Sequence, residues 1–143
     1  MTKTENDPAT LKESAHFCVW KYEHLPGQEK PSKVPYNPKT GGRAQSTNPG
    51  TFARFEDANA VQGKYNGLGV GMFGTLCAVD IDHCVDDKGE LSVLARDVIS
   101  IMDSYTELSP SGKGVRILFT APEAKYDKAA YYIKKSESGL EVY

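Results

Sequence analysis

The stretch Leu76-Cys77-Ala78-Val79-Asp80-Ile81-Asp82 joins an apolar, partly β-branched run to two aspartates in alternation. This composition predicts a buried strand that ends at the two carboxylates. Farther along, apolar residues recur at helical spacing and predict an amphipathic helix packed on a sheet: Leu91, Leu94, Ala95, Val98, Ile99 and Met102. Together with further strands, this pattern predicts an α+β fold with a mixed or antiparallel sheet and packed helices.

The remaining elements are predicted from shorter signals. Asp7-Pro8 has the form of a helix N-cap followed by proline, which predicts a helix to about Ser14. Strands are predicted at residues 17–22, 105–108 and 115–119 and from residue 140, a helix at 51–62, a long loop at 24–50, and a hairpin of 67–73 with 76–81. Residues 1–14 are therefore expected to form an arm or short helix, and residues 15–143 one domain. That domain is expected to be incomplete, because the chain stops within an apolar alternation.

Composition limits the function classes. Of the 143 residues, 39% are hydrophobic and 25% are charged, which favours a packed core over disorder. Lys plus Arg (17) nearly balances Asp plus Glu (19), and this excludes a polybasic mode of nucleic-acid binding. No apolar run approaches the roughly 20 residues of a membrane span, and the first 14 residues are too polar for a signal peptide. With three cysteines and no disulfide framework, a cytoplasmic location is expected.

Asp80 and Asp82 form the first candidate site. On a strand they point to the same face with Cα atoms ~6.6 Å apart. Two carboxylates held this way repel each other unless a cation lies between them, and their hard oxygen ligands suit Mg²⁺ or Mn²⁺. The structural alternative is that both aspartates simply end a strand at the surface.

Two other metals fit the same region poorly. A calcium-binding EF-hand loop beginning at Asp80 needs glycine and glutamate where Val85 and Leu91 stand. A zinc site would have to use Cys77, His83 and Cys84, which lack a second ligand pair at suitable spacing. Cys18 and Cys77 are therefore predicted to be small core residues.

Two further segments are rich in groups that bind phosphate. The segment 109–116 contains Ser109, Ser111, Lys113 and Arg116 with two glycines, which permit backbone N–H groups to converge on an anion. The same segment also fits a glycine-rich hairpin turn. The segment 33–43 offers Lys33, Tyr36, Lys39 and Arg43 as contacts to a nucleic acid or a nucleotide, or forms an ordinary surface loop.

In this order along the chain, the segments resemble the N-terminal primase-polymerase domain of phage and plasmid replication proteins, in the archaeo-eukaryotic primase superfamily. The resemblance extends from Trp20 through residues 33–38, 80–84 and 105–114 to the final Leu140-Glu141-Val142-Tyr143. It implies a fold with an RRM-like core and a DNA-dependent primase and polymerase activity. Nucleoside triphosphates and a single-stranded DNA template would be its partners, with a helicase domain downstream in the full-length protein and no membrane partner.

The resemblance also implies residue roles. Asp80, Asp82 and Glu141 match the carboxylates that hold two Mg²⁺ or Mn²⁺ ions for nucleotidyl transfer, and are therefore the implied catalytic residues. Ser109, Ser111 and Lys113 match a motif that holds the triphosphate. Arg116 stands where that motif often has histidine, and arginine binds phosphate but does not transfer protons. The alternatives are a non-catalytic module that binds nucleotide or single-stranded DNA, and a metal-dependent phosphodiesterase.

Overall fold

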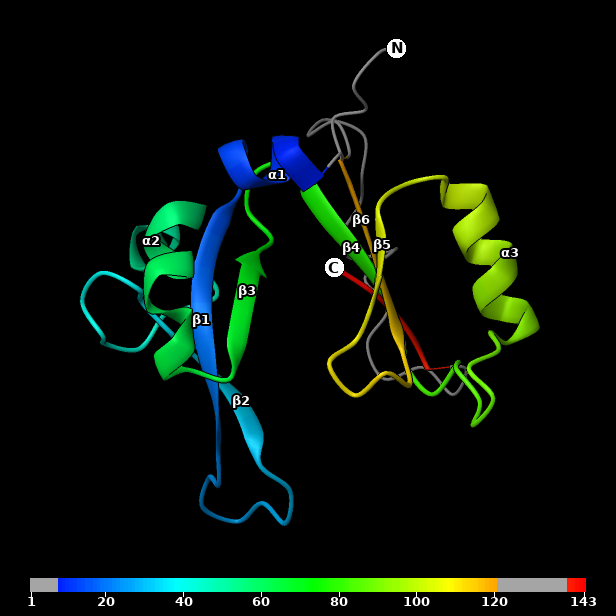
Figure 1. Ribbon diagram of the computed structural model, residues 1–143, viewed down its shortest axis with the longest axis horizontal. Coiled ribbons are helices and arrows are strands. Elements are labelled where there is room, and N and C mark those ends of the chain that lie inside the picture. Colours follow the sequence, from blue (N-terminus) through cyan, green and yellow to red (C-terminus); the bar gives the residue numbers. More distant parts are fainter. Residues whose placement is uncertain (1–7, 121–138) are drawn as a thin grey trace. The chain divides into compact units, whose positions relative to one another are not determined.

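Two antiparallel sheets, one in each of two units of the chain, form the fold. The computed structural model describes residues 8–120 and 139–143. The N-terminal unit is Ala9–Phe73 and the C-terminal unit is Gly74–Tyr143. Each described unit combines strands with helix, and the predicted α+β class is therefore confirmed (Figure 1).

The N-terminal unit is a three-stranded sheet with a helix on one face. Its elements in chain order are α1 (Pro8–Ser14), β1 (His16–Glu23), β2 (Ser32–Tyr36), the short 3-10 helix η1 (Pro49–Thr51), α2 (Phe55–Val61), the 3-10 helix η2 (Gln62–Lys64) and β3 (Gly67–Gly71). The strand order is β2-β1-β3. Phe17 and Val19 of β1 alternate toward α2 and form a core with its Ala58.

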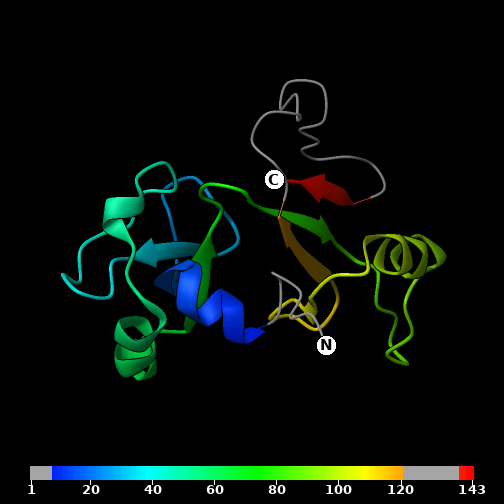
Figure 2. The same ribbon diagram turned by 90° about the horizontal axis from the view of Figure 1, so that it is seen from above.

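The C-terminal unit is a four-stranded sheet with one long helix. Its elements are β4 (Leu76–Ile81), α3 (Val93–Met102), β5 (Thr106–Leu108), β6 (Val115–Thr120) and β7 (Leu140–Val142), and the strand order is β5-β6-β4-β7. The view in Figure 2 separates α3 from the strands of this sheet. Ala95 of α3 packs on Val79, Ile81 and Ile117, so every second residue of β4 and β6 faces the helix. The remaining residues of these strands face the other way.

The predicted long loop at residues 24–50 is wrong in its middle, because β2 lies within it. β2 pairs with β1 along its whole length, from Val19 opposite Tyr36 to Glu23 opposite Ser32. Pro35 suppressed the strand signal in the sequence. Proline is tolerated in β2 because this strand lies at the edge of its sheet, where one side needs no ladder hydrogen bonds.

The predicted hairpin of residues 67–73 with 76–81 is also wrong. β3 pairs with β1 in the N-terminal unit, whereas β4 pairs with β6 and β7 in the C-terminal unit. Gly74, which lies between the two strands, has a left-handed φ of 64°. A local turn signal specifies a change of direction but not the strand that follows as a partner.

Two helices begin later than predicted. α2 begins at Phe55, because the Thr51 hydroxyl is engaged elsewhere: it accepts a hydrogen bond from the Gln45 N–H (2.8 Å) and donates one to the Asn48 carbonyl (2.7 Å). α3 begins at Val93 because Ser92 caps it, accepting a hydrogen bond from the Ala95 N–H at 3.2 Å.

The other element predictions agree with the structure within a few residues. α1 confirms the predicted N-terminal helix, although its expected cap, Asp7, lies outside the described residues. That residues 15–143 form one domain stays a prediction. Of the helices that the structure describes, none has the length and apolar character needed to cross a bilayer.

Candidate functional site

Four charged residues form a single row across the sheet of the C-terminal unit. The strand registers place Glu107 of β5 opposite Arg116 of β6, Arg116 opposite Asp80 of β4, and Asp80 opposite Glu141 of β7. Directly opposed residues in an antiparallel pair have Cα atoms about 4.5–5.5 Å apart. Glu141, which lies far from Asp80 in sequence, is therefore its immediate neighbour in the fold. We call these four residues the charged row.

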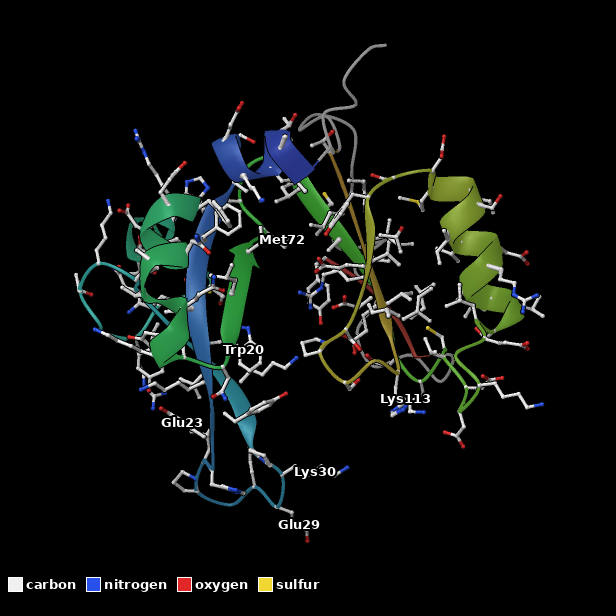
Figure 3. The ribbon with its side chains drawn as sticks, viewed as in Figure 1. Trp20, Glu23, Glu29, Lys30, Met72 and Lys113 are labelled. Atoms are coloured by element: carbon white, nitrogen blue, oxygen red, sulfur yellow. The ribbon has the colours of Figure 1, made fainter. Side chains whose placement is uncertain are left out.

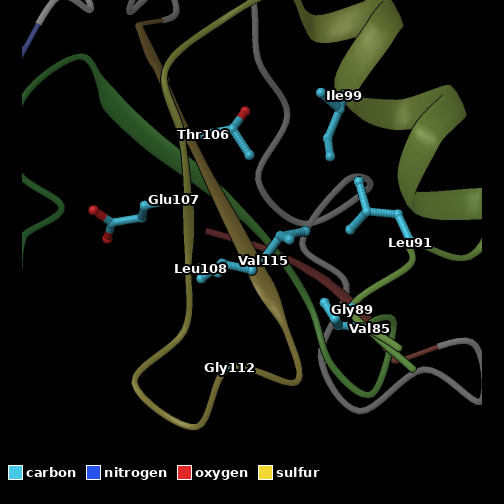
Figure 4. Close-up of a pocket in the computed structure, with 9 residues that line it drawn as sticks. All are labelled: Val85, Gly89, Leu91, Ile99, Thr106, Glu107, Leu108, Gly112 and Val115. Atoms are coloured by element: carbon cyan, nitrogen blue, oxygen red, sulfur yellow. The ribbon is translucent and has the colours of Figure 1, made fainter. Parts of the chain in front are cut away.

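The charged row lies on the face of the sheet opposite α3. Neighbouring residues along each strand, such as Val79, Ile81 and Ile117, belong to the core beneath the helix. Because side chains alternate along a strand, the row residues point away from that core. In the close-up of Figure 4, the side chain of Glu107 points away from Thr106 and Ile99, in keeping with this alternation.

Arg116 binds the carboxylate of Asp80 with two hydrogen bonds. Its Nε donates to Oδ1 at 2.7 Å and its Nη2 donates to Oδ2 at 3.2 Å. The Asp80 side chain is only 18% exposed, against 44% for that of Arg116. This hydrogen bonding raises the pKa of Arg116 above its ordinary value, so the guanidinium stays charged. The charge of Asp80 is therefore already balanced within the sheet.

Glu141 and Asp82 occupy different environments. Glu141 accepts a hydrogen bond from the hydroxyl of Tyr143. Asp82 follows β4 directly and is exposed, and its N–H donates to the Gly139 carbonyl at 2.9 Å. Gly139 has a φ of 76°, and a Cβ there would lie 2.8 Å from the Asp82 carbonyl oxygen. The backbone that leads into β7 thus lies against the end of β4.

Asp80 and Glu141 therefore lie on adjacent strands and Asp82 directly follows β4, but the three predicted metal ligands do not form a ready metal cluster. No three His, Cys, Asp or Glu side chains among residues 8–120 and 139–143 are arranged to hold a metal ion. The donor set itself fits Mg²⁺ or Mn²⁺, since all three side chains offer hard carboxylate oxygens. To serve as a metal ligand, Asp80 would have to release Arg116 at least in part. The zinc alternative gains no support, because Cys77 and Cys84 are buried, as is Cys18.

The segment 109–114 forms the turn between β5 and β6, beside the end of β4. The Ser109 N–H donates to the Gly114 carbonyl (2.8 Å), and the Ser109 hydroxyl accepts from the Gly114 N–H (3.0 Å) and lies 3.0 Å from the Ser111 hydroxyl. A Cβ at Gly114 would lie 2.9 Å from the Ile81 carbonyl oxygen. The segment therefore forms a glycine-rich hairpin turn that packs directly against the residue before Asp82, and phosphate binding by this turn stays a prediction.

Lys113, labelled in Figure 3, connects this turn to the segment that follows β4 through hydrogen bonds and an ion pair. Its carbonyl accepts hydrogen bonds from the N–H groups of Cys84 (2.9 Å) and Val85 (3.1 Å), and its ammonium group pairs with Asp87 at 2.8 Å. Both cations predicted to bind phosphate, Lys113 and Arg116, are thus paired with aspartates in this structure.

The other four predicted contact residues lie in the N-terminal unit. Lys33 and Tyr36 of β2 point to opposite faces of its sheet. Lys33 lies over the indole of Trp20, 5.0 Å from its ring centroid. The Tyr36 hydroxyl donates to Glu23, which raises the pKa of Tyr36, and Arg43 pairs with the same carboxylate at 3.2 Å. Lys39 is 3.9 Å from Asp57 at the surface. Tyr36 and Arg43 therefore form a local network that holds the residues after β2.

An apolar pocket lies beside the edge strand β5, next to residues 85–91 and α3. It has a volume of about 370 Å³ (Figure 4) and is lined by Val85, Gly89, Leu91, Ile99, Thr106, Glu107, Leu108, Gly112 and Val115. Apart from Glu107, which also belongs to the charged row, the side chains that line this pocket are mostly apolar.

Glu107 and the aromatic pair Trp20 and Tyr22 were not singled out in the sequence analysis as candidate site residues. Glu107 belongs to the charged row, but only the strand register reveals it. Trp20 and Tyr22 share a face of β1 with each other, ring centroids 5.0 Å apart, and Lys33 lies opposite Tyr22 on β2. The alternation of residues 16–22 could have indicated that both rings share one face.

Comparison with known proteins identifies a relative. No family model matches the chain. Over 138 residues, covering 93% of this chain, the sequence is 31% identical to a protein of Nitratiruptor phage NrS-1 described as a DNA primase-polymerase. The predicted resemblance to the primase-polymerase family is confirmed. The match covers 18% of the relative's own length. Because nearly all of this chain is matched, the primase-polymerase relationship extends over most of both units.

Proposed function

We propose that this chain carries the nucleotidyl-transfer site of a primase-polymerase, which synthesises or extends a primer on a single-stranded DNA template. The observation that carries the proposal is the charged row, in which Glu141 lies beside Asp80 at the same register. The 31% identity to a phage DNA primase-polymerase supports it independently.

In this proposal Asp80, Asp82 and Glu141 hold Mg²⁺ or Mn²⁺. Bound divalent ions in such sites activate an attacking hydroxyl and stabilise the departing pyrophosphate. The sheet contributes rigidity, because Asp80 stands between two paired strands and β7 is attached to β4 over three registered pairs. Rigid placement matters, since small displacements of ligands in a catalytic site cost large factors in rate.

The turn at residues 109–114 and Arg116 would bind the triphosphate. Arg116 offers a planar donor pair, which now fits the carboxylate of Asp80 and fits a phosphate equally well. Lys113 offers a second positive charge once it leaves the exposed Asp87. Release of both cations from aspartate would free the carboxylates for metal ions and the cations for phosphate at the same time.

Incorporation of labelled nucleotides on single-stranded DNA with Mn²⁺ or Mg²⁺ tests this proposal. Asp80→Asn keeps the size of the side chain and removes its charge, and it should lower incorporation by at least about 100-fold. Asp97→Asn on the exposed surface of α3 is the matched control and should leave the rate unchanged. Undiminished incorporation by the Asp80 variant would reject the assignment of the site.

One observation favours a second candidate, a module that binds nucleotide or DNA without catalysis. The paired state of Asp80 and Arg116 neutralises a carboxylate that catalysis needs free. Calorimetry distinguishes the two, because a binding module would take up nucleoside triphosphate with Mn²⁺ present and release no pyrophosphate.

A further inference from the structure

One face of the N-terminal sheet carries two aromatic rings and a lysine. Phe17 and Val19 of β1 point to α2, so the alternate residues Trp20 and Tyr22 lie on the opposite face. The β1–β2 register places Lys33 directly opposite Tyr22. We call Trp20, Tyr22 and Lys33 the Trp20 face.

The indole of Trp20 (labelled in Figure 3) packs against β3 at two of its glycines. A Cβ at Gly67 would lie 2.6–2.9 Å from three atoms of the indole, and a Cβ at Gly69 would lie 2.8 Å from the sulfur of Cys18 and 3.7 Å from the indole. The indole N–H donates to the Leu68 carbonyl at 2.9 Å. The ring therefore lies close against the strand backbone and loses little further freedom when a ligand binds.

The groups around the indole suit an aromatic base and its phosphate. Tyr22 is 48% exposed and meets Trp20 edge-on, with an angle of 79° between the ring planes. The ammonium of Lys33 lies 5.0 Å from the indole centroid. Aromatic rings beside a cation are the arrangement by which proteins bind unpaired strands, since bases stack on the rings and the cation meets the backbone.

The N-terminal unit carries a net positive charge, which favours the binding of a nucleic-acid strand, and the C-terminal unit carries a net negative charge. Residues 9–73 carry eight Lys and Arg against five Asp and Glu, a net charge of +3. Residues 74–143 carry eight against twelve, a net charge of −4. A polyanion is therefore attracted to the N-terminal unit, and metal ions are attracted to the C-terminal unit.

We propose that the Trp20 face binds an unpaired DNA strand, with one base stacked on Trp20, another on Tyr22, and a phosphate bound by Lys33. This inference rests on the proposed function in one respect: template-directed synthesis supplies the unpaired strand. Duplex DNA fits poorly, because the faces of its bases are already stacked. Lys33 moves from the indole to the phosphate when the strand binds, and thereby uncovers the ring.

The fluorescence of the intact chain tests the proposal directly, because Trp20 is its one tryptophan. Addition of an oligothymidylate should quench the indole emission in a saturable way. The same length of duplex and free thymidine triphosphate, each at matched phosphate concentration, should quench much less. Absence of quenching by the single strand, or equal quenching by the duplex or by the triphosphate, would overturn the proposal.

Two lysine variants distinguish specific binding at the Trp20 face from nonspecific attraction of DNA to positive charge. Lys33→Ala should weaken oligothymidylate binding by roughly tenfold. Lys21→Ala is the matched control: it removes the same charge from the adjacent strand, where Lys21 lies over Tyr65 on the opposite face at 4.9 Å. Its affinity should stay within about twofold of the unchanged chain. Equal losses in the two variants would mean that the strand is held by net charge alone.

The outcome is independent of the nucleotidyl-transfer assay. The chain could show no incorporation activity but still show quenching that Lys33→Ala weakens. That result would support DNA binding by the Trp20 face and reject the proposed function. Incorporation activity without quenching would support the proposed function and reject DNA binding by the Trp20 face.

Discussion

Arg116 and Asp80 lie opposite each other on β6 and β4 and share two hydrogen bonds, at 2.7 and 3.2 Å. The carboxylate predicted to bind a metal ion is therefore already bound by a cation of the same sheet. A metal ion must compete with that cation, and a nucleotide phosphate would assist by binding the released guanidinium. In the proposed metal site, this coupling would make the metal affinity depend on Arg116.

Removal of the competing cation should strengthen metal binding. We expect Arg116→Gln to bind Mn²⁺ about three- to tenfold more tightly than the unchanged chain, as measured by calorimetry without nucleotide. The same variant should bind nucleoside triphosphate more weakly, because a phosphate donor is lost. Arg96→Gln, which removes an exposed arginine of α3 in the same unit, is the control and should change neither affinity. Unchanged or weaker Mn²⁺ binding in the Arg116 variant would contradict the competition.

The close approach of Gly114 to β4 should make this position intolerant of a side chain. In Gly114→Ala the new Cβ would meet the Ile81 carbonyl oxygen at 2.9 Å and the Ser109 hydroxyl at 3.3 Å. Because the nearest atom is backbone, the turn must move, and we expect about 1–3 kcal/mol less stability to urea. Gly63→Ala is the control, since nothing lies within 4 Å of its Cβ and its φ is not positive. Equal stability of the two variants would show that the turn is not held against β4.

The N-cap of α3 should contribute measurably to the C-terminal unit. Ser92→Ala removes the acceptor for the Ala95 N–H, and we expect a loss of about 1 kcal/mol in thermal or urea unfolding. Ser100→Ala, at an exposed position within the same helix, should be neutral or slightly stabilising, because alanine has the higher helix propensity. A loss of similar size at both serines would exclude a specific capping effect.

Burial raises the pKa of the Cys18 thiol from 9.0 to about 11. A thiol with a higher pKa in the folded than in the unfolded state holds its proton more tightly when folded. Its contribution to stability is therefore present below pH 9 and is lost as the pH rises from about 9 to about 11. We expect the free energy of unfolding to fall by about 2 kcal/mol more over this range in the unchanged chain than in Cys18→Ala. The comparison cancels the titration of lysines and tyrosines, and parallel pH curves for the two proteins would contradict the shift.

The sequence predicted the positions of individual strands and helices better than the pairing of the strands. Alternation and helical periodicity are local signals, and they located β1, β4, β6 and α3 within a few residues. Strand pairing depends on contacts between distant segments, which is why the hairpin of residues 67–73 with 76–81 was predicted wrongly. β2 was missed because Pro35 is unfavourable in a strand unless that strand lies at an edge.

The candidate site shows the same division. The residue types at positions 80, 82 and 109–116 indicated cation and phosphate chemistry without any structure. That Glu141 stands beside Asp80 came from the family resemblance, since no local pattern links residues 61 positions apart. The pairing of Asp80 with Arg116 and that of Lys113 with Asp87 depend on register and on turn geometry, and sequence spacing does not determine either.

The net charge of the charged row has a further consequence for binding. One guanidinium stands among three carboxylates, so these four positions together carry two negative charges. A single divalent ion would make the row neutral, and a neutral row would offer a polyphosphate little attraction. A second ion would reverse its sign. In the proposed site the triphosphate should therefore bind together with the ions rather than before them, and the ions should retain an anion that the row alone would repel.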